Sequence, residues 1–98
     1  MFVHMVWFEW KEDATPAQID AAIAGLAGMK GLIPGVLDVQ VGKNETARTA
    51  HTHGLLVILE KAADLPIYDA HEVHQRVVKE LIKPIIKNVN ALDFTGTA

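Results

Sequence analysis

Cysteine and serine are both absent from this 98-residue chain. Without cysteine there can be no disulfide, zinc–thiolate site or thiol nucleophile, and without serine there is no serine nucleophile. No apolar run approaches the roughly 20 residues that a membrane-spanning helix needs. The first residues lack the basic and apolar regions of a signal peptide. We therefore expect a cytoplasmic protein with no membrane partner.

Positive charge is also scarce. Nine Lys and Arg residues stand against twelve Asp and Glu, which gives a formal net charge of −3. A nucleic-acid binder normally carries a basic stripe, so we expect no nucleic-acid partner. Half of the residues are hydrophobic and 21% are charged, a composition typical of a packed domain. The sequence predicts one domain spanning residues 1–98.

The hydrophobic pattern predicts alternating strands and helices. Thr15, Pro16 and Gln18 have the spacing of a helix start with a capping box. The expected order is strand, helix, strand, strand, helix, strand, over residues 2–10, 16–30, 36–41, 52–60, 64–86 (with a break near Ala70) and 88–94. This order is that of the ferredoxin-like α+β fold, in which a four-stranded antiparallel sheet carries both helices on one face.

The first strand is apolar on both faces. Its odd positions include Val3, Met5 and Trp7, and its even positions are also mostly apolar. Helices on one face of the sheet would leave the odd face bare, and a bare apolar sheet needs a partner. We expect a homodimer in which two such sheets pack face to face.

Polar side chains that suit proton transfer recur on the opposite, helix-facing side. Tyr68, His71 and His74 follow at three-residue steps, so they are neighbours on a helix surface. His4 and His53 lie at the strand positions expected to face the helices. We predict that these five side chains converge in a small-molecule pocket. Its expected apolar walls are Val6, Phe8 and Val57.

Two other interpretations of the same residues stay open. The five side chains could form a buried polar network that only satisfies its own hydrogen bonds. His71 and His74, with His4 or His53, could instead supply imidazoles to zinc or copper. The chain shows no closed ligand set, so we expect neither a metal nor another cofactor.

Several short motifs, in this order and spacing, make the chain similar to the stress-responsive dimeric α+β-barrel (Dabb) domain family. The resemblance covers nearly the whole chain and implies a homodimer whose two sheets form a barrel. The motifs are His4, Ile33-Pro34-Gly35-Val36, Val41-Gly42, Thr52-His53, Tyr68 with His71 and His74, and Asp93-Phe94.

A plant branch of this family includes a polyketide cyclase, olivetolic acid cyclase. The resemblance implies that its catalytic tyrosine and histidine match Tyr68 and His74, and that its other pocket histidines match His4, His53 and His71. The family usually has proline where this chain has Glu72, and the role of Glu72 is open.

The expected function is therefore binding of a small, largely apolar, oxygenated molecule. If the protein is an enzyme, we expect a cofactor-free cyclase, lyase or isomerase, with His74 as base and Tyr68 as hydrogen-bond donor to the developing oxyanion. The alternative is a non-catalytic stress-response or interaction protein in which the dimer is the functional unit.

Overall fold

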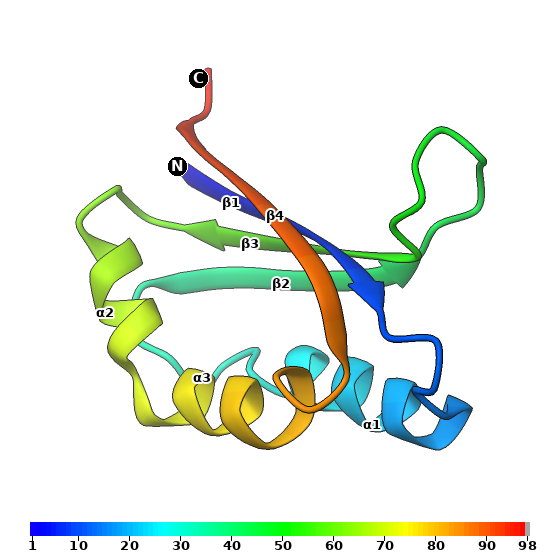
Figure 1. Cartoon of the computed structure of the whole chain (residues 1–98). Coiled ribbons are helices and arrows are strands. Elements are labelled where there is room, and N and C mark those ends of the chain that lie inside the picture. Colours follow the sequence, from blue (N-terminus) through cyan, green and yellow to red (C-terminus); the bar gives the residue numbers. More distant parts are fainter. Residues whose placement is uncertain (98) are drawn as a thin grey trace.

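The computed structural model describes residues 1–97 and has the predicted order of elements. Four strands and the helical segments alternate along the chain (Figure 1): β1 (Phe2–Trp10), α1 (Pro16–Ala27), β2 (Val36–Lys43), β3 (His53–Leu59), α2 (Asp64–Ala70), α3 (Glu72–Val77), the π-helical turn η1 (Val78–Ile82) and β4 (Ile86–Thr95). Within residues 1–97, no helix is long and apolar enough to cross a membrane.

The strands form one antiparallel sheet in the order β2-β3-β1-β4, and the helices lie together on one face of it (Figure 1). Val6 pairs with Leu55, and Val39 pairs with Val57. All four side chains are buried in the core, so the predicted helix-facing positions are confirmed. The ferredoxin-like α+β fold is therefore confirmed.

The start of α1 follows from its capping residues. The Gln18 amide N–H donates to the Thr15 hydroxyl at 3.2 Å, and the Thr15 amide N–H donates to the Gln18 side chain at 2.9 Å. This reciprocal pair satisfies two amides that the first turn would otherwise leave free. Ala22 and Leu26, one turn apart, are buried against the sheet.

The second helical region is interrupted, as the expected break near Ala70 indicated. His71 has an extended backbone (φ −63°, ψ 138°) between α2 and α3. The region ends in η1, where the Lys83 amide donates to the Val78 carbonyl at 2.9 Å, five residues back. Pro84 has no N–H with which to continue the helix. The predicted helix to residue 86 is thus too long, and β4 begins at Ile86.

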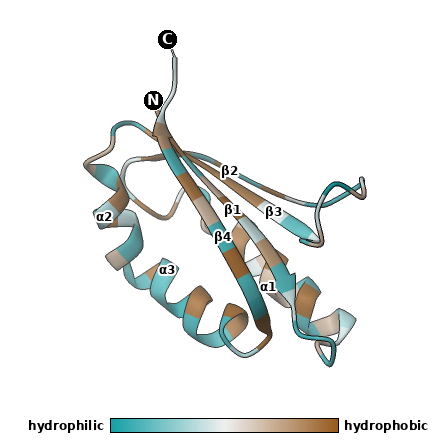
Figure 2. Cartoon of the chain, turned by 45° about the horizontal axis from the view of Figure 1, so that its top comes forward, coloured by the Kyte–Doolittle hydropathy of each residue, from teal (hydrophilic) through white to brown (hydrophobic). Residues whose placement is uncertain are grey.

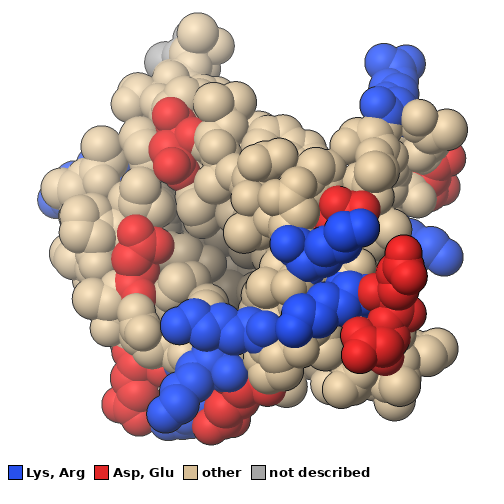
Figure 3. Space-filling model, viewed as in Figure 1, with Lys and Arg blue, Asp and Glu red and all other residues tan. Residues whose placement is uncertain are grey.

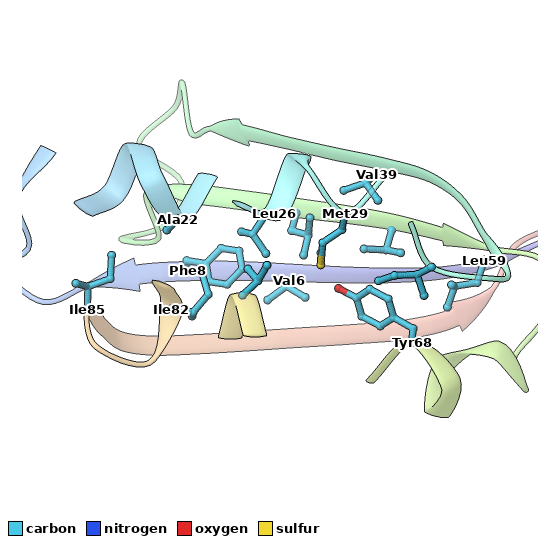
Figure 4. Packing of buried hydrophobic residues seen from close by; sticks show 14 of the residues in the cluster. Val6, Phe8, Ala22, Leu26, Met29, Val39, Leu59, Tyr68, Ile82 and Ile85 are labelled. Carbon is cyan, nitrogen blue, oxygen red and sulfur yellow. The ribbon is translucent and has the colours of Figure 1, made fainter. Parts of the chain in front are cut away.

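The core fills the layer between helices and sheet (Figure 4). Phe8 and Trp10 stack with ring centroids 5.3 Å apart and planes 4° from parallel. Leu26 and Met29 come from the α1 side and are also buried. This middle part of the layer is therefore occupied by apolar side chains.

The outer face of the sheet and the edge strand β4 are less covered. On the outer face, Leu92 is 53% exposed and Phe94 41% exposed. Figure 2 shows hydrophobic and hydrophilic residues alternating along β4, which runs beside β1 at the edge of the sheet. The start of β1 and the end of β4 lie close together (Figure 1), and the Gly96 amide donates to the Met1 carbonyl at 3.0 Å.

The turn before β2 generates a stability prediction. Gly31 (φ +80°) and Gly35 (φ +84°) both have left-handed backbone, but only a Cβ at Gly35 would meet another side chain, 2.7 Å from Cγ of the buried Asp64. Gly31→Ala should lower the free energy of unfolding by about 1 kcal/mol through backbone strain alone. Gly35→Ala should lower it by at least about 2 kcal/mol, because the Asp64 carboxylate must also move. Urea unfolding of both variants measures the difference, and equal losses would contradict the contact with Asp64.

Candidate functional site

Three of the predicted side chains come together below the β1–β4 edge of the sheet. The Tyr68 ring, from α2, lies edge-on to the His4 ring of β1, with centroids 5.5 Å apart and planes at 60°. The His74 ring of α3 also contacts the Tyr68 ring, with centroids 4.4 Å apart and planes at 42°. The structure thus places His4, Tyr68 and His74 in one group, as the sequence predicts.

The orientation of His74 is set by the end of α2. Nδ1 of His74 lies 3.0 Å from the carbonyl oxygen of Asp69. A carbonyl can only accept, so Nδ1 must carry the proton. In the neutral ring the basic nitrogen is then Nε2. This tautomer leaves Nε2 available to accept a proton or a hydrogen bond.

Asp93, on β4, joins the group through His4. His4 and Asp93 are paired across the strands, and Nδ1 of His4 is hydrogen-bonded to Oδ1 of Asp93. The His4 side chain is 12% exposed and that of Asp93 is 36% exposed, so the pair reaches from the buried layer to the surface. We call His4, Tyr68, His74 and Asp93 the Tyr68 cluster. Asp93 was not predicted as a site residue and appeared only within a family motif. Its even spacing from Ala91 and Val89 on β4 was the signal that could have placed it on the helix-facing side of the sheet.

The Tyr68 hydroxyl is the unusual polar group of the cluster. Tyr68 is fully buried, and its hydroxyl has no hydrogen-bond partner. Figure 4 shows the hydroxyl pointing into the part of the core that holds Met29 and Val6. Burial, assisted by the Asp69 carboxylate, raises the pKa of Tyr68 above its usual value. The phenol therefore keeps its proton at neutral pH and acts as a donor.

His71 has a local structural role. Its Nδ1 accepts from the Val73 amide at 3.1 Å, which makes it the N-cap of α3. In the neutral ring, Nδ1 is thus the acceptor and Nε2 carries the proton. The side chain is half-buried. Among the contacts in the structure, His71 is linked to α3 and not to the Tyr68 ring.

His53 lies at the other end of the layer. It pairs with Phe8 across the strands, whereas His4 pairs with Val57. The two histidines are thus four residues apart along the sheet, roughly 13 Å. Nδ1 of His53 accepts from the Trp10 indole N–H at 3.0 Å. The structure therefore does not bring His53 to the Tyr68 cluster, and the expected convergence of all five side chains does not extend to it.

The three predicted wall residues lie between these two ends. Val6 (8% exposed), Phe8 (4%) and Val57 (0%) are packed in the core. Two hollows in the surface reach neither Phe8 nor Val57. One of about 660 Å³ lies on the sheet under residues 44–51, with Trp7 and Leu56 in its lining. Another of about 320 Å³ lies beside His53.

Charges of both signs are mixed on the face of the molecule that Figure 3 shows. On the face in Figure 3, Lys and Arg side chains lie next to Asp and Glu. Across residues 1–97, no three His, Cys, Asp or Glu side chains gather closely enough to hold a metal ion. That the protein uses no cofactor and binds no nucleic acid remains a prediction.

His53 generates a pH prediction. Its burial, with a smaller effect of the Lys43 charge, lowers its pKa below the 6.5 of an ordinary histidine. The unfolded chain then takes up a proton more readily than the folded one, so the free energy of unfolding should fall as pH drops below 6.5 towards the folded pKa. Urea midpoints at pH 7 and pH 5 should show a smaller acid loss for His53→Gln than for the unmodified protein. Equal losses, or an NMR titration of His53 above 6.5, would contradict this.

Known proteins resemble this chain in sequence and in fold. It is 34% identical over 93 residues to a stress-response A/B barrel domain-containing protein of Arabidopsis thaliana, covering 93% of this chain and 35% of that protein. The chain thus spans about a third of the length of this curated relative.

Among solved structures, a dimeric ferredoxin-like protein of unknown function from Thermobifida fusca superposes with a TM-score of 0.84 at 21% identity, over 95% of this chain and 88% of that one. The hydroxynitrile lyase of Passiflora edulis superposes with a TM-score of 0.84 at 19% identity, over 95% and 90%. At these identities the likeness shows the shared fold.

The sequence match identifies the family more specifically than the similarity of fold does. Residues 2–96 match the Stress responsive A/B Barrel Domain, which is nearly the whole chain. The match includes the strands and helices that carry His4, Tyr68, His74 and Asp93. This chain is a member of the Dabb stress-responsive A/B barrel family.

Proposed function

We propose that the Tyr68 cluster binds a small, largely apolar, oxygenated molecule. The observation that carries the proposal is the Tyr68 hydroxyl, which is buried without a partner. Such a group costs about 1–3 kcal/mol. An oxygen atom of a bound molecule would accept its hydrogen bond and remove that cost. The apolar side chains around it suit an apolar ligand body.

The same geometry supports cofactor-free proton transfer. With Nδ1 held by the Asp69 carbonyl, Nε2 of His74 is the basic nitrogen. It would take a proton from an activated carbon or a hydroxyl of the ligand, and Tyr68 would donate a hydrogen bond to the oxygen that becomes negative. The reaction class is that of a cyclase, lyase or isomerase. A hydroxynitrile lyase has the same fold, but at 19% identity this likeness does not carry over its activity. The proposal therefore rests on the residues of this chain.

Asp93 and His4 mark the expected route to the buried hydroxyl. Asp93 is exposed on β4, and its partner His4 contacts the Tyr68 ring. Met29 is buried in the region towards which the hydroxyl points (Figure 4). Methionine adapts its shape easily. A ligand would therefore enter beside Asp93 and be accommodated by movement of Met29.

Replacement of Tyr68 by phenylalanine tests the proposal. Tyr68→Phe should raise the free energy of unfolding of the ligand-free protein by about 1 kcal/mol, because it deletes an unpaired buried hydroxyl. The same variant should lose the thermal shift that aromatic or β-keto compounds give the unmodified protein. His74→Gln, which keeps a side chain able to donate to Asp69, should retain binding and lose turnover.

Two results of these measurements on Tyr68→Phe would contradict the proposal. A compound that stabilises the unmodified protein and Tyr68→Phe equally would show that the hydroxyl does not take part in binding. A loss of more than about 1 kcal/mol in ligand-free Tyr68→Phe would show that the hydroxyl already has a favourable partner.

The second candidate is a non-catalytic protein whose functional unit is a homodimer. The uncovered outer face of the sheet favours it, since Met5 and Trp7 are only half-buried there and Leu92 and Phe94 are exposed. A small domain gains stability by covering such a face. The T. fusca protein of the same fold is dimeric. We propose that two copies of this chain pack through these outer faces.

Changing Met5 to aspartate tests the dimer. Met5→Asp should shift the sedimentation coefficient to that of a monomer or produce aggregates, because it places a charge in an apolar contact. The matched control is Leu32→Asp, which changes an apolar side chain that is 58% exposed and lies outside the sheet. The control should leave the dimer intact. A monomeric unmodified protein, or a dimer in Met5→Asp, would contradict this interface.

A further inference from the structure

We propose that the hollow beside His53 is a second binding site, which takes a small zwitterion of the amino-acid type with an apolar side chain. This His53 hollow lies where the end of β1, the start of α1 and the end of β2 meet. It is lined by Trp10, Pro16, Ile19, Asp20, Lys43, Thr52 and His53. Nothing in the proposed function of the Tyr68 cluster uses these side chains.

His53 supplies a fixed hydrogen-bond donor. The Trp10 indole can only donate, so Nδ1 of His53 is the acceptor in their 3.0 Å hydrogen bond. A histidine with Nδ1 as acceptor carries its proton on Nε2. Because burial and Lys43 lower the pKa of His53, the ring is neutral at pH 7 and keeps this tautomer. Nε2–H is therefore the donor that remains for a ligand.

The charges of the hollow have opposite signs and come from different elements. Lys43, at the end of β2, and Asp20, on α1, both line it. Both act on His53 electrostatically, Lys43 lowering its pKa and Asp20 raising it. A ligand carboxylate fits beside Lys43 and the His53 donor, and a ligand ammonium fits beside Asp20. This pairing selects a molecule with both charges.

Apart from Thr52, the remaining lining is apolar, and the space is small. Trp10, Pro16 and Ile19 offer hydrophobic surface for a side chain. The volume, about 320 Å³, lies at the lower end of the roughly 300–1,000 Å³ of ligand pockets. A single amino acid with an aromatic or branched side chain matches this size better than a peptide does.

The two sites are separated by the packed core. The buried Phe8 ring stands on β1 between His4 of the Tyr68 cluster and Trp10, which lines the His53 hollow; the Phe8 and Trp10 rings stack with centroids 5.3 Å apart. Ligands at the two sites would therefore not touch each other. Each site can be tested without the other.

Phenylalanine and two derivatives are suitable probes in NMR titrations of the full chain. Phenylalanine should shift the Trp10 indole and His53 ring signals with a Kd on the order of 1 mM, as expected for a small ligand in a shallow site. The Trp7 indole, which lies on the other face of the sheet, is the internal reference. N-acetylphenylalanine lacks the ammonium and phenylalaninamide lacks the carboxylate, so each should bind roughly tenfold more weakly.

Variants of Lys43 and Asp20 test which of these side chains binds the carboxylate of the ligand and which binds its ammonium group. Lys43→Gln should weaken the binding of phenylalanine and N-acetylphenylalanine, which carry a carboxylate, and leave the binding of phenylalaninamide unchanged. Asp20→Asn should remove the advantage of phenylalanine over N-acetylphenylalanine. Lys79→Gln, which changes an exposed lysine on η1, is the matched control and should bind as the unmodified protein does.

Three results would overturn the proposal: no shift of Trp10 with phenylalanine, equal binding of all three probes, or shifts of Tyr68 and His74 signals alone. The last result would assign the ligand to the Tyr68 cluster. Failure of Tyr68→Phe to alter binding of aromatic or β-keto compounds would overturn only the function proposed for that cluster.

Discussion

The interruption of the second helical region at His71 is the constraint on which the Tyr68 cluster depends. The extended backbone there ends α2, so that Asp69 keeps a carbonyl free to accept from His74. The His71 side chain then caps α3 and starts the next helix in a new direction. Tyr68 and His74 thereby belong to different helices and still meet ring to ring.

One consequence is that the tautomer of His74 is set by backbone geometry. A side-chain partner could rotate away, but the Asp69 carbonyl is held by the helix to which it belongs. This helix end also receives the Gln75 side chain at 2.6 Å, so two side chains of α3 converge on a single α2 carbonyl. These two hydrogen bonds link α2 to α3.

The layer between helices and sheet has polar groups at both ends and apolar packing in its middle. His4 and His53 face the same side of the sheet, but the buried Phe8 ring stands on β1 between His4 and Trp10, the hydrogen-bond partner of His53. A large pocket running through the layer would need a small side chain at the position of Phe8. The buried Phe8 ring instead fills this part of the layer.

Much of the fold follows from the sequence because its signals are local. The Thr15 cap and the alternation in β1 depend only on neighbouring residues, and both were predicted. The alternation also gave the face on which His4 and His53 lie. It could not give their separation along the sheet, because this depends on the strand register.

The parts of the site that were missed depend on contacts distant in the chain. Asp93 meets His4 only through the β1–β4 pairing. Tyr68 and His74 were expected to be neighbours on one helix surface, whereas the break at His71 places them on α2 and α3. The unpaired Tyr68 hydroxyl is a property of the completed core, and no local pattern indicates it.

The start of β1 and the end of β4 are close enough for a short segment to connect them. β1 and β4 lie side by side, and a hydrogen bond from Gly96 to Met1 joins their ends. A short linker could therefore join one end to the other, or join the domain to a second copy, without crossing either face of the sheet. The geometry of this fold therefore suits gene duplication and circular permutation, since neither the helical layer nor the outer face of the sheet would have to be crossed.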